Sequence, residues 1–597
     1  MAQAPQGVMS SRPQLMLSQP GVARDGTRLS QQSYLMAYWC RWYQGKPRKM
    51  RGYVEQLRSV NGIVRAIDVF SNDGFSFVHI ASGRAIQRFA INNAGGGNTG
   101  LIDRTPVGYL PNDSFNWQLA EQVDIPTNTT MIYANGTPSA SSITTSSAHP
   151  VYYGDIIAST PLIQIPDGTA FTGSISGTTL TVTAMPSGFL EEGVEIFGSG
   201  IPAGTEIVSV TTEFSPGPPV VNGVYELNNS MIASSMAMTA HQVRSSGGIC
   251  AVGLTLFLYG HDGIIQWSTS TSSIDFIGEG SGDSRPVGDK IVRALPIRGQ
   301  SGPAIILWSL SSVIIGSFVG PPLDWDFTTV TTTGSILSSN GVIEHEGIYY
   351  WPTTSGWALF NGVVRELPNN DNKQWFLDNL NWDERQKVFA YKVTRWSEIW
   401  WCFPRGNATE CNWAVIYNWI EKRWYDTPLP NGGRSAGFYE FVYNYPIMAG
   451  IEPHEDTAGG YSMWQHEYGL DEMSGVVAIA RAIRAGFQTH EFNVVVAPPG
   501  QPGADQGLSY SILEPDFDQK GPLDFTVISR ANARARERVT GPISIVETPE
   551  TPDQQLTKFK HSGRLTSFRI ESNWLGGDFI AGSPVVHWQP GDARRED

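Results

Sequence analysis

A run of aromatic and basic residues near the N-terminus is the most distinctive candidate for chemistry in this sequence. Residues 38–43 contain four aromatic side chains, and further basic residues follow at once. Aromatic rings can stack on nucleobases while lysine and arginine neutralise phosphates, so this combination could bind DNA. The alternative is an aromatic anchor with a solvated, charged face against another subunit, which the acidic balance of the chain favours. The candidate partner or DNA contacts are Arg41, Lys46, Arg48, Lys49 and Arg51.

A serine motif further along the chain matches the pattern of a hydrolase nucleophile. Residues 433–437 read G-x-S-x-G, with Ser435 at the centre. Such a motif exposes its serine only where a strand precedes it and a helix follows it. Here a Pro-Asn-Gly turn precedes the motif, and the strand-like stretch 438–442 follows it. The local sequence therefore favours a turn between strands, and we predict no catalytic residue.

Patterns for metal and cofactor binding are weak throughout. The histidine and carboxylate clusters at 344–346 and 452–456 lack H-E-x-x-H, and neighbouring residues on a strand point to opposite faces. The acidic loop 514–518 lacks the ligand ladder of a calcium site, and 278–283 has the wrong glycine spacing for a dinucleotide. The four cysteines form no C-x-x-C pair. We therefore expect no metal, no cofactor and no enzymatic activity.

The composition favours a β-rich protein that does not hold nucleic acid tightly. Only 16% of the residues are charged, whereas the chain has 63 glycines, 38 prolines and 19 tryptophans. Glycine and proline disfavour helix interiors, and aromatic side chains suit pleated surfaces. The net charge of −15 opposes tight binding to phosphate. A basic stretch, 530–538, could pair with an acidic segment of another subunit, although solvated faces are the commoner outcome.

The sequence shows no signal for export or for membrane insertion. The N-terminal residues 1–20 are polar and lack the charged and then apolar pattern of a signal peptide. No uncharged apolar run reaches the length that a membrane helix needs. We expect synthesis in a cytoplasm and no membrane segment.

Alternating apolar and polar residues predict short strands joined by glycine-bearing turns. Residues 64–91 contain three such runs, which predict a meander. Aromatic units of the same kind recur at 254–268, 304–318, 347–360 and 398–425. Their spacing of roughly 40–55 residues is typical of propeller blades, each of which needs neighbours to cover its sheet. We predict a mostly β fold with a β-propeller of about six blades.

One stretch interrupts this pattern and predicts a separate module. Residues 169–240 are rich in threonine, serine and glycine, and they alternate strictly with turns of their own. We predict a small β-sandwich-like module inserted into a loop, with its two ends close together. The predicted domains are an N-terminal arm and platform part (1–61), the first part of the propeller (62–168), the inserted module (169–240), the rest of the propeller (241–470) and a C-terminal β-rich platform part (471–597).

Two parts of the sequence together resemble a known family. The first is the set of aromatic units between 342 and 437. The second is a C-terminal pattern that comprises Gly563-Arg564-Leu565, Phe568-Arg569-Ile570-Glu571-Ser572-Asn573, Gly582 and Pro590-Gly591-Asp592-Ala593-Arg594-Arg595. In these features the chain resembles the tail nozzle, or DNA stabilisation, proteins of short-tailed, podovirus-type bacteriophages. The segment 169–240 separately resembles a Thr/Gly-rich module that is often inserted in phage surface proteins.

The resemblance implies a structural role at the tail tip of a virion, after synthesis in the host cytoplasm. Nozzle proteins form a homo-hexameric ring below the head-to-tail adaptor ring, which encloses the DNA exit channel, retains packaged DNA and guides its ejection. By resemblance, the N- and C-terminal parts would form a platform against the adaptor, with the propeller outside. The implied partners are the adaptor, tail fibres or spikes, double-stranded DNA in passage and, through the inserted module, the host cell surface.

The sequence is also compatible with a second class of function. The tryptophan-rich propeller and the inserted module would also suit a receptor-binding tail fibre or tailspike that recognises or cleaves host-surface glycans. That class usually carries parallel β-helix repeats, whereas this chain shows blade-like units. It would also need exposed tryptophans beside paired carboxylates, and most tryptophans here lie within strands, where burial is expected.

Overall fold

The computed structural model is built almost entirely from short strands. It describes residues 12–590 except 17, 28–29, 73, 93–98, 108, 110, 112–115, 137–150, 166–168, 186–189, 191–193, 203–204, 216–219, 242–244, 277–279, 299–301, 322, 333, 431, 440–444, 455–458, 475–478, 494, 497–503, 506 and 548–555. Among these residues the only α-helix is α1 (Lys373–Asn379), and no helix is long and apolar enough to cross a membrane. The prediction of a mostly β fold is confirmed.

The chain divides into two compact units, each formed from separate stretches of sequence. The first unit contains Met1–Ser59, Ser355–Trp357 and Glu366–Asp597. The second contains Val60–Thr354 and Ala358–Arg365. The first unit therefore takes strands from both ends of the chain, whereas the second unit is nearly continuous in sequence.

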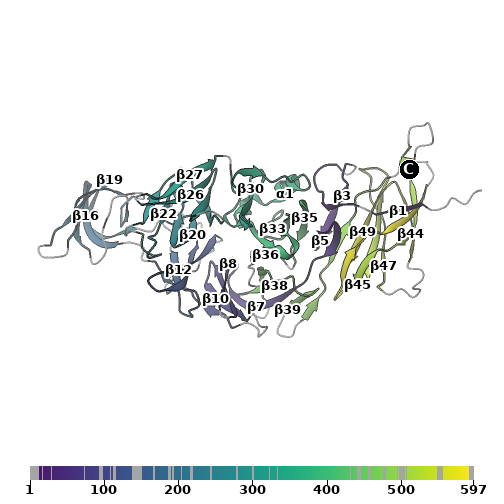
Figure 1. The fold of residues 1–597 in the computed structure, drawn as a ribbon, viewed down its shortest axis with the longest axis horizontal. Coiled ribbons are helices and arrows are strands. Elements are labelled where there is room, and N and C mark those ends of the chain that lie inside the picture. The colour runs from purple at the N-terminus through teal and green to yellow at the C-terminus, as the bar shows by residue number, and fades with distance from the viewer. Residues whose placement is uncertain are drawn as a thin grey trace, which may run out of the picture. The chain divides into compact units, whose positions relative to one another are not determined.

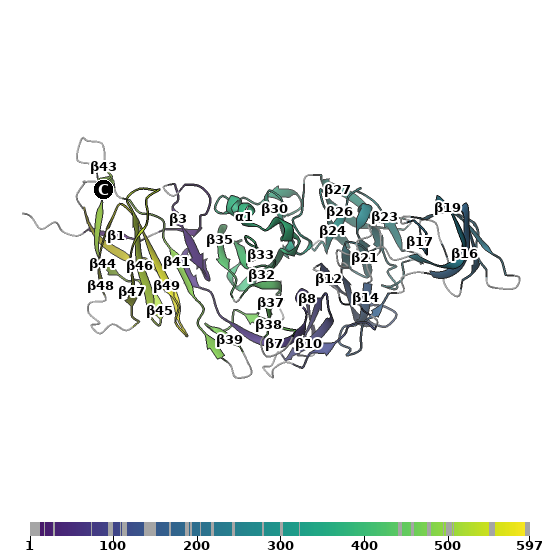
Figure 2. The same cartoon turned by 180° about the vertical axis from the view of Figure 1, so that it is seen from behind.

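Four sheets of the second unit share one plan. Each sheet has four antiparallel strands that follow one another along the chain, as in a meander (Figures 1 and 2). The strands are β8 (Val64–Asn72), β9 (Phe75–Ser82), β10 (Ile86–Asn92) and β11 (Ile102–Asp103); β12 (Trp117–Asp124), β13 (Thr129–Gly136), β14 (Val151–Asp155) and β15 (Ile163–Gln164); β20 (Gly248–Val252), β21 (Thr255–Tyr259), β22 (Ile265–Trp267) and β23 (Gly282–Ser284); and β24 (Ile291–Pro296), β25 (Ala304–Ser309), β26 (Val313–Gly320) and β27 (Asp324–Thr331). Small four-stranded sheets of this kind are the building units of propellers.

Three further groups of four strands follow a similar order. The strands are β28 (Ile343–His345), β29 (Ile348–Thr353), β30 (Gly356–Phe360) and β31 (Val364–Glu366); β32 (Phe389–Val393), β33 (Glu398–Phe403), β34 (Trp413–Asn418) and β35 (Arg423–Pro428); and β36 (Arg434–Phe438), β37 (Ile447–Pro453), β38 (Gly460–His466) and β7 (Tyr53–Asn61). In the last group the fourth strand comes from the N-terminal part of the chain. Beyond β7, that sheet continues with β39 (Glu472–Ser474) and β40 (Ile479–Arg481).

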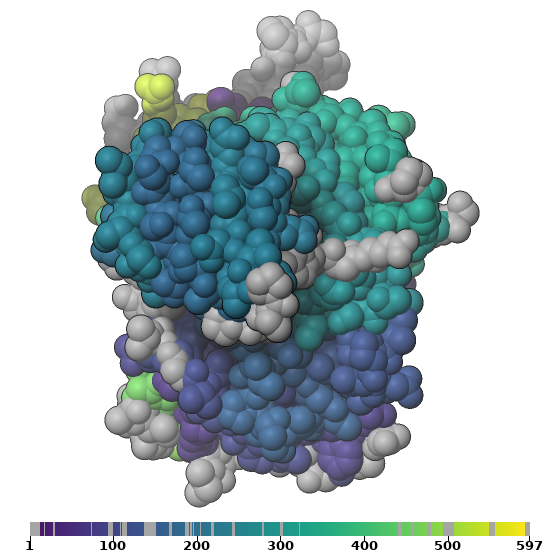
Figure 3. All heavy atoms as spheres, turned by 90° about the vertical axis from the view of Figure 1, so that its left-hand side faces the viewer, coloured from purple at the N-terminus to yellow at the C-terminus, as the bar shows by residue number. Residues whose placement is uncertain are grey.

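The segment 169–240 forms a sheet of its own. Its strands are β16 (Thr169–Ala184), β17 (Glu195–Phe197), β18 (Ile207–Thr212) and β19 (Gly223–His241). Thr169 lies opposite Ala240 on paired strands, which confirms the prediction that the two ends of the segment are close together. Its buried core includes Phe171, Leu180 and Tyr225. Figure 3 looks onto this segment, whose atoms form a rounded blue-teal lobe.

Deleting residues 169–240 is expected to leave the rest of the chain folded. The segment has its own core, and a short Gly-Ser linker can join the two neighbouring strands because their ends are paired. The free energy of unfolding of the remaining chain, measured by urea unfolding, should change by less than about 0.5 kcal/mol. Loss of soluble protein on this deletion would show that the segment is an integral part of its unit.

Three sheets of the first unit combine strands from both ends of the chain (Figure 1). They consist of β1 (Arg12–Leu15), β51 (Val585–Pro590), β44 (Leu508–Glu514) and β48 (Thr557–Gly563); β4 (Met36–Tyr38), β41 (Ala485–Gln488), β49 (Leu565–Ser572), β46 (Leu523–Arg530) and β47 (Arg538–Ile545); and β45 (Phe517–Lys520), β50 (Asp578–Ala581), β6 (Lys46–Lys49) and β5 (Cys40–Tyr43). β1 pairs with β51, β4 with β41 and β6 with β50, all antiparallel. We call these three sheets the terminal body.

Tryptophan supplies much of the core, as the sequence predicts for residues within strands. Fourteen of the nineteen tryptophans are buried. Trp42 of the terminal body packs against Tyr34 and Tyr425, with ring centroids 5.1 and 5.2 Å apart. Large aromatic side chains bury more apolar area than any other residue type, so short strands can still build a stable core.

Candidate functional site

The basic and aromatic N-terminal segment folds as a tight hairpin of the terminal body. β5 and β6 pair antiparallel, with Arg41 opposite Arg48 and Tyr43 opposite Lys46. The two-residue turn between them, Gln44-Gly45, has positive φ at both positions, 53° and 74°. This geometry suits a hairpin because its twist matches that of the strands.

Arg41 lies at the centre of a buried charge cluster. Its Nη1 and Nη2 donate to Glu467 at 2.8 and 2.6 Å, and Nη2 also donates to Glu398 at 3.1 Å. Glu398 further accepts hydrogen bonds from Trp400 and Tyr425, at 2.8 and 2.6 Å. The side chain of Arg41 is only 1% exposed, and that of Glu398 is fully buried. We call Arg41, Glu398 and Glu467 the buried triad.

The charges of the buried triad depend on one another. Burial alone would lower the pKa of Arg41, but the two carboxylates outweigh this effect and raise its pKa. Burial raises the pKa of Glu398, because the charge of Arg41 offsets only part of the desolvation. For Glu467 burial acts in the same direction, but the charge and hydrogen bonds of Arg41 outweigh it, so its pKa is lowered. Arg41 therefore stabilises two buried acids at once.

The burial of Arg41 and Lys49 corrects the prediction that they contact DNA or a partner. Lys49 is also only 1% exposed, and its Nζ donates to the carbonyl of Gly577 at 2.7 Å. Burial lowers the pKa of the Lys49 ammonium group. Both side chains are held by groups of the same unit, so neither reaches a surface from which it could bind a phosphate.

The other three predicted contacts are spread around the hairpin. Lys46 is exposed, whereas Arg48 and Arg51 are half-buried. The guanidinium of Arg48 lies 4.6 Å from the ring centroid of Trp396, and Arg51 pairs with Asp578 at 3.4 Å. The five residues thus do not form one basic surface, and only Lys46 is freely presented.

A more exposed basic surface lies elsewhere in the terminal body. Arg530, the last residue of β46, is nearly buried and pairs with Glu491 at 3.3 Å, so it anchors the start of the loop that leads to β47. Arg534, Arg536 and Arg538 are exposed. The exposed side chains Lys558 and Lys560 lie on β48, whose His561 hydrogen-bonds Thr540 of β47 at 2.8 Å. We call the exposed residues Arg534, Arg536, Arg538, Lys558 and Lys560 the basic loop surface.

The basic loop surface could be foreseen only in part from the sequence. The run of arginines at 530–538 is visible, but not which of them anchors the loop. The contribution of β48 depends on the pairing of β46, β47 and their neighbours and has no signal in the linear pattern. Arginine presents a planar fork that suits carboxylate and phosphate groups, so either group could bind here.

Ser435 of the G-x-S-x-G motif lies on β36 and is 5% exposed. Its Oγ has no hydrogen-bond partner and is buried. Arg434, which precedes Ser435 in the same strand, donates from Nε to Nε2 of His466 at 3.1 Å. The serine is thus enclosed within a sheet, without the exposed position that a nucleophile needs.

Replacing Ser435 by alanine is expected to change the free energy of unfolding by less than about 1 kcal/mol, because its hydroxyl makes no hydrogen bond that the variant would lose. Urea unfolding followed by tryptophan fluorescence measures this change. A chromogenic ester assay on both proteins gives a second result. If the wild type cleaved the ester and the variant did not, Ser435 would be a nucleophile after all.

Among the residues that the structure describes, no group of three histidine, cysteine, aspartate or glutamate residues could hold a metal ion. Glu344 and His345 lie on β28, and Glu344 accepts a hydrogen bond from the backbone of Gly347 at 2.7 Å. Residues 455–456, 278–279 and 591–595 lie outside the described residues.

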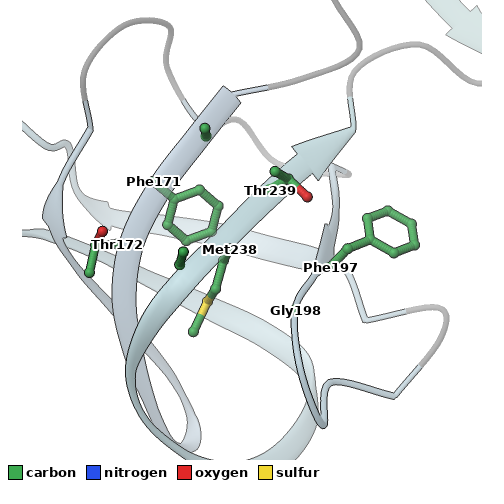
Figure 4. Close-up of a pocket in the computed structure, with 8 residues that line it drawn as sticks. Phe171, Thr172, Phe197, Gly198, Met238 and Thr239 are labelled. Atoms are coloured by element: carbon green, nitrogen blue, oxygen red, sulfur yellow. The ribbon is translucent and has the colours of Figure 1, made fainter. Parts of the chain in front are cut away.

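The inserted segment carries an open groove of about 470 Å³ (Figure 4). It is mainly apolar and lies between β16, β17 and β19. Phe171 and Met238, both buried, lie side by side in its floor. The residues that line it include Thr172, Phe197, Gly198 and Thr239. None of the lining side chains titrates, so the groove offers apolar contact and hydroxyl groups but no acid or base.

Comparisons with known proteins show no family for this chain. No family model matches the chain, and no curated protein matches it. Among the solved structures, it is similar to an ancestral GH74 enzyme, with 10% identity over 69% of this chain and 66% of that chain. The TM-score of 0.27 is low, so this likeness carries no argument about a substrate or a reaction.

The expectation of no enzymatic activity is nevertheless corrected. It rested only on missing catalytic patterns in the sequence. A β-sheet scaffold neither grants nor denies catalysis, because activity depends on side chains that several loops bring together. The absence of a familiar motif is therefore no ground for excluding an activity.

Proposed function

We propose that this chain is a subunit of the tail nozzle of a short-tailed bacteriophage and that six copies form a ring below the head-to-tail adaptor. The observation that carries the proposal is the terminal body, in which strands from both ends of the chain pair in the same sheets. A platform built from both ends is what the resemblance to nozzle proteins implies. The blade-like sheets and the acidic composition give further support.

We also propose that the blade-like sheets form a propeller of seven blades, one more than the sequence suggests. Seven groups of four strands follow the same order, and in the seventh β7 joins β36, β37 and β38. β7 comes from the start of the chain and completes the last sheet, and such a pairing of the two ends can close a ring of blades. The five units that the sequence shows do not include two of these groups, β12–β15 and β36–β38 with β7.

The acidic balance supports a conduit through which DNA slides. Six copies at −15 each would carry on the order of −90, simply six times −15. Carboxylates that face a channel repel phosphate, so a duplex would not be held by counterion release. The basic loop surface would give a local contact within this repulsive field, to phosphate or to acidic groups of the adaptor.

The mass of the purified protein, alone and with its adaptor ring, tests the proposal. We expect six copies to join each adaptor ring, and electron microscopy of the complex should show a closed ring around a central channel. A control with Arg298→Gln, in the second unit, should assemble equally well, because this side chain is 71% exposed and lies outside the terminal body. A stable trimer that ignores the adaptor would contradict the nozzle and favour a receptor-binding fibre or spike.

A further inference from the structure

Two arginines and a histidine of the second unit are buried beside one another. His79 of β9 lies directly opposite Arg88 of β10, and Arg104 follows β11, the next strand of the same sheet. The three residues are 1%, 4% and 1% exposed. Burial lowers the pKa of His79 to about 3, and the charges of Arg104 and Arg88 act in the same direction, so its ring is neutral near pH 7.

Part of this cluster has an ordinary structural role. The Nε of Arg104 donates to the carbonyl of Thr160 at 2.8 Å, and Nη1 of Arg88 donates to the carbonyl of Ile157. These carbonyls lie in the connection between β14 and β15. The two arginines thus bind the connection of the neighbouring sheet, but these bonds use only one donor of each.

The remaining polar atoms of these three side chains are buried without a partner. Nη1 and Nη2 of Arg104, Nε of Arg88 and Nε2 of His79 make no hydrogen bond and have almost no exposed surface. A buried polar group without a partner costs about 1–3 kcal/mol, and more where it is charged. Four such atoms in one place are far more than a stable sheet ordinarily leaves unsatisfied.

Among the residues that the structure describes, no carboxylate forms an ion pair with either arginine, although Asp68 of β8 lies directly opposite His79. The acidic group whose charge acts on both arginines is Asp155. Its Oδ1 accepts a hydrogen bond from the backbone of Ile157 at 2.8 Å. Burial and, to a lesser extent, the charge of Arg88 lower the pKa of Arg104 to about 10. Buried cations of this kind call for a negative partner.

We propose that this cluster binds a single chloride ion, which accepts hydrogen bonds from the free donors of Arg104 and Arg88, with His79 at its side. A monatomic anion fits better than a tetrahedral one because the surroundings are tightly packed. A Cβ at Gly154 would lie 2.9 Å from Nη2 of Arg104 and 2.9 Å from the side chain of Leu162. The site would hold the sheets β8–β11 and β12–β15 together through one shared charge.

Thermal unfolding in chloride tests the proposal. At constant ionic strength, replacing gluconate by chloride from about 1 to about 300 mM should raise the unfolding midpoint of the wild type by at least about 3 °C. Arg104→Gln should abolish this rise. The matched control Arg298→Gln, whose side chain is 71% exposed, should keep it. An equal rise in all three proteins would reflect general salt effects and would overturn the site.

A second measurement uses the unaltered chain and does not depend on how the variant folds. Crystals soaked in bromide should show an anomalous peak within hydrogen-bond distance of Nη1 or Nη2 of Arg104. No peak there would overturn the proposal. A parallel stability series with phosphate separates the two kinds of anion, and stabilisation by phosphate but not by chloride would overturn the assignment of a monatomic ion.

Discussion

Replacing Arg41 by methionine is expected to lower the free energy of unfolding of the first unit by about 3–5 kcal/mol. Methionine keeps much of the volume and all of the apolar character, so packing against Trp396 is largely retained. It removes the only cation of the buried triad, which leaves Glu398 and Glu467 buried without a counter-charge. Urea unfolding followed by tryptophan fluorescence measures the loss, since the cluster contains Trp396 and Trp400.

The matched control is Lys46→Met on the same hairpin. Lys46 is exposed, so this change should stay within about 0.5 kcal/mol. Combining Arg41→Met with Glu398→Gln and Glu467→Gln should recover part of the loss, because the charges that remain unpaired are then removed. A loss below about 1 kcal/mol in the single variant would contradict the idea that these three charges hold the hairpin in place.

Lowering the pH from about 7.5 to about 5.5 is expected to destabilise the first unit through His466. Burial, and then the charge of Arg434, lower the pKa of His466 well below its usual value of about 6.5. Its Nε2 accepts a hydrogen bond from Arg434 at 3.1 Å, which requires a neutral ring. The unfolded chain takes up a proton as the pH falls through about 6.5, whereas the folded chain does not. Stability is therefore full above this pH and falls by up to about 1.4 kcal/mol per pH unit below it.

His466→Gln isolates this contribution, because the amide does not titrate and all other groups are present in both proteins. The variant should lose less stability than the wild type between the two pH values, whatever its stability at pH 7.5. The midpoint of urea unfolding at each pH gives the comparison. Parallel pH profiles for the two proteins would mean that His466 is protonated in the folded chain and that the bond from Arg434 is not kept.

The strands were largely predictable, because their pattern is local. Alternation over two residues is imposed by the geometry of a strand, so 64–91 and 398–425 predict the meanders β8–β10 and β33–β35. The inserted segment 169–240 was visible for the same reason. The pairing of β7 with β38 was not predictable from the sequence. β7 precedes β38 by some 400 residues, and no local pattern indicates which distant strand completes the group β36–β38.

The hairpin of β5 and β6 shows more clearly what sequence patterns cannot predict. The sequence places five basic side chains beside four aromatic rings, and this arrangement suggested one exposed surface. Strand alternation alone sends Arg41 and Lys49 to opposite faces of the hairpin, but it does not say what covers each face. The groups that bury them, Glu398, Glu467 and the carbonyl of Gly577, come from distant parts of the chain.

The sequence by itself determined the β-rich character, the acidic balance and the position of the inserted segment. Each follows from composition or from a periodicity of a few residues, which the backbone imposes wherever the chain lies. Only the tertiary structure decided that both chain ends share the sheets of the terminal body and which charges are buried. Burial of a charge is favourable only where a partner lies within a few ångströms, and that proximity arises from folding between residues far apart in sequence.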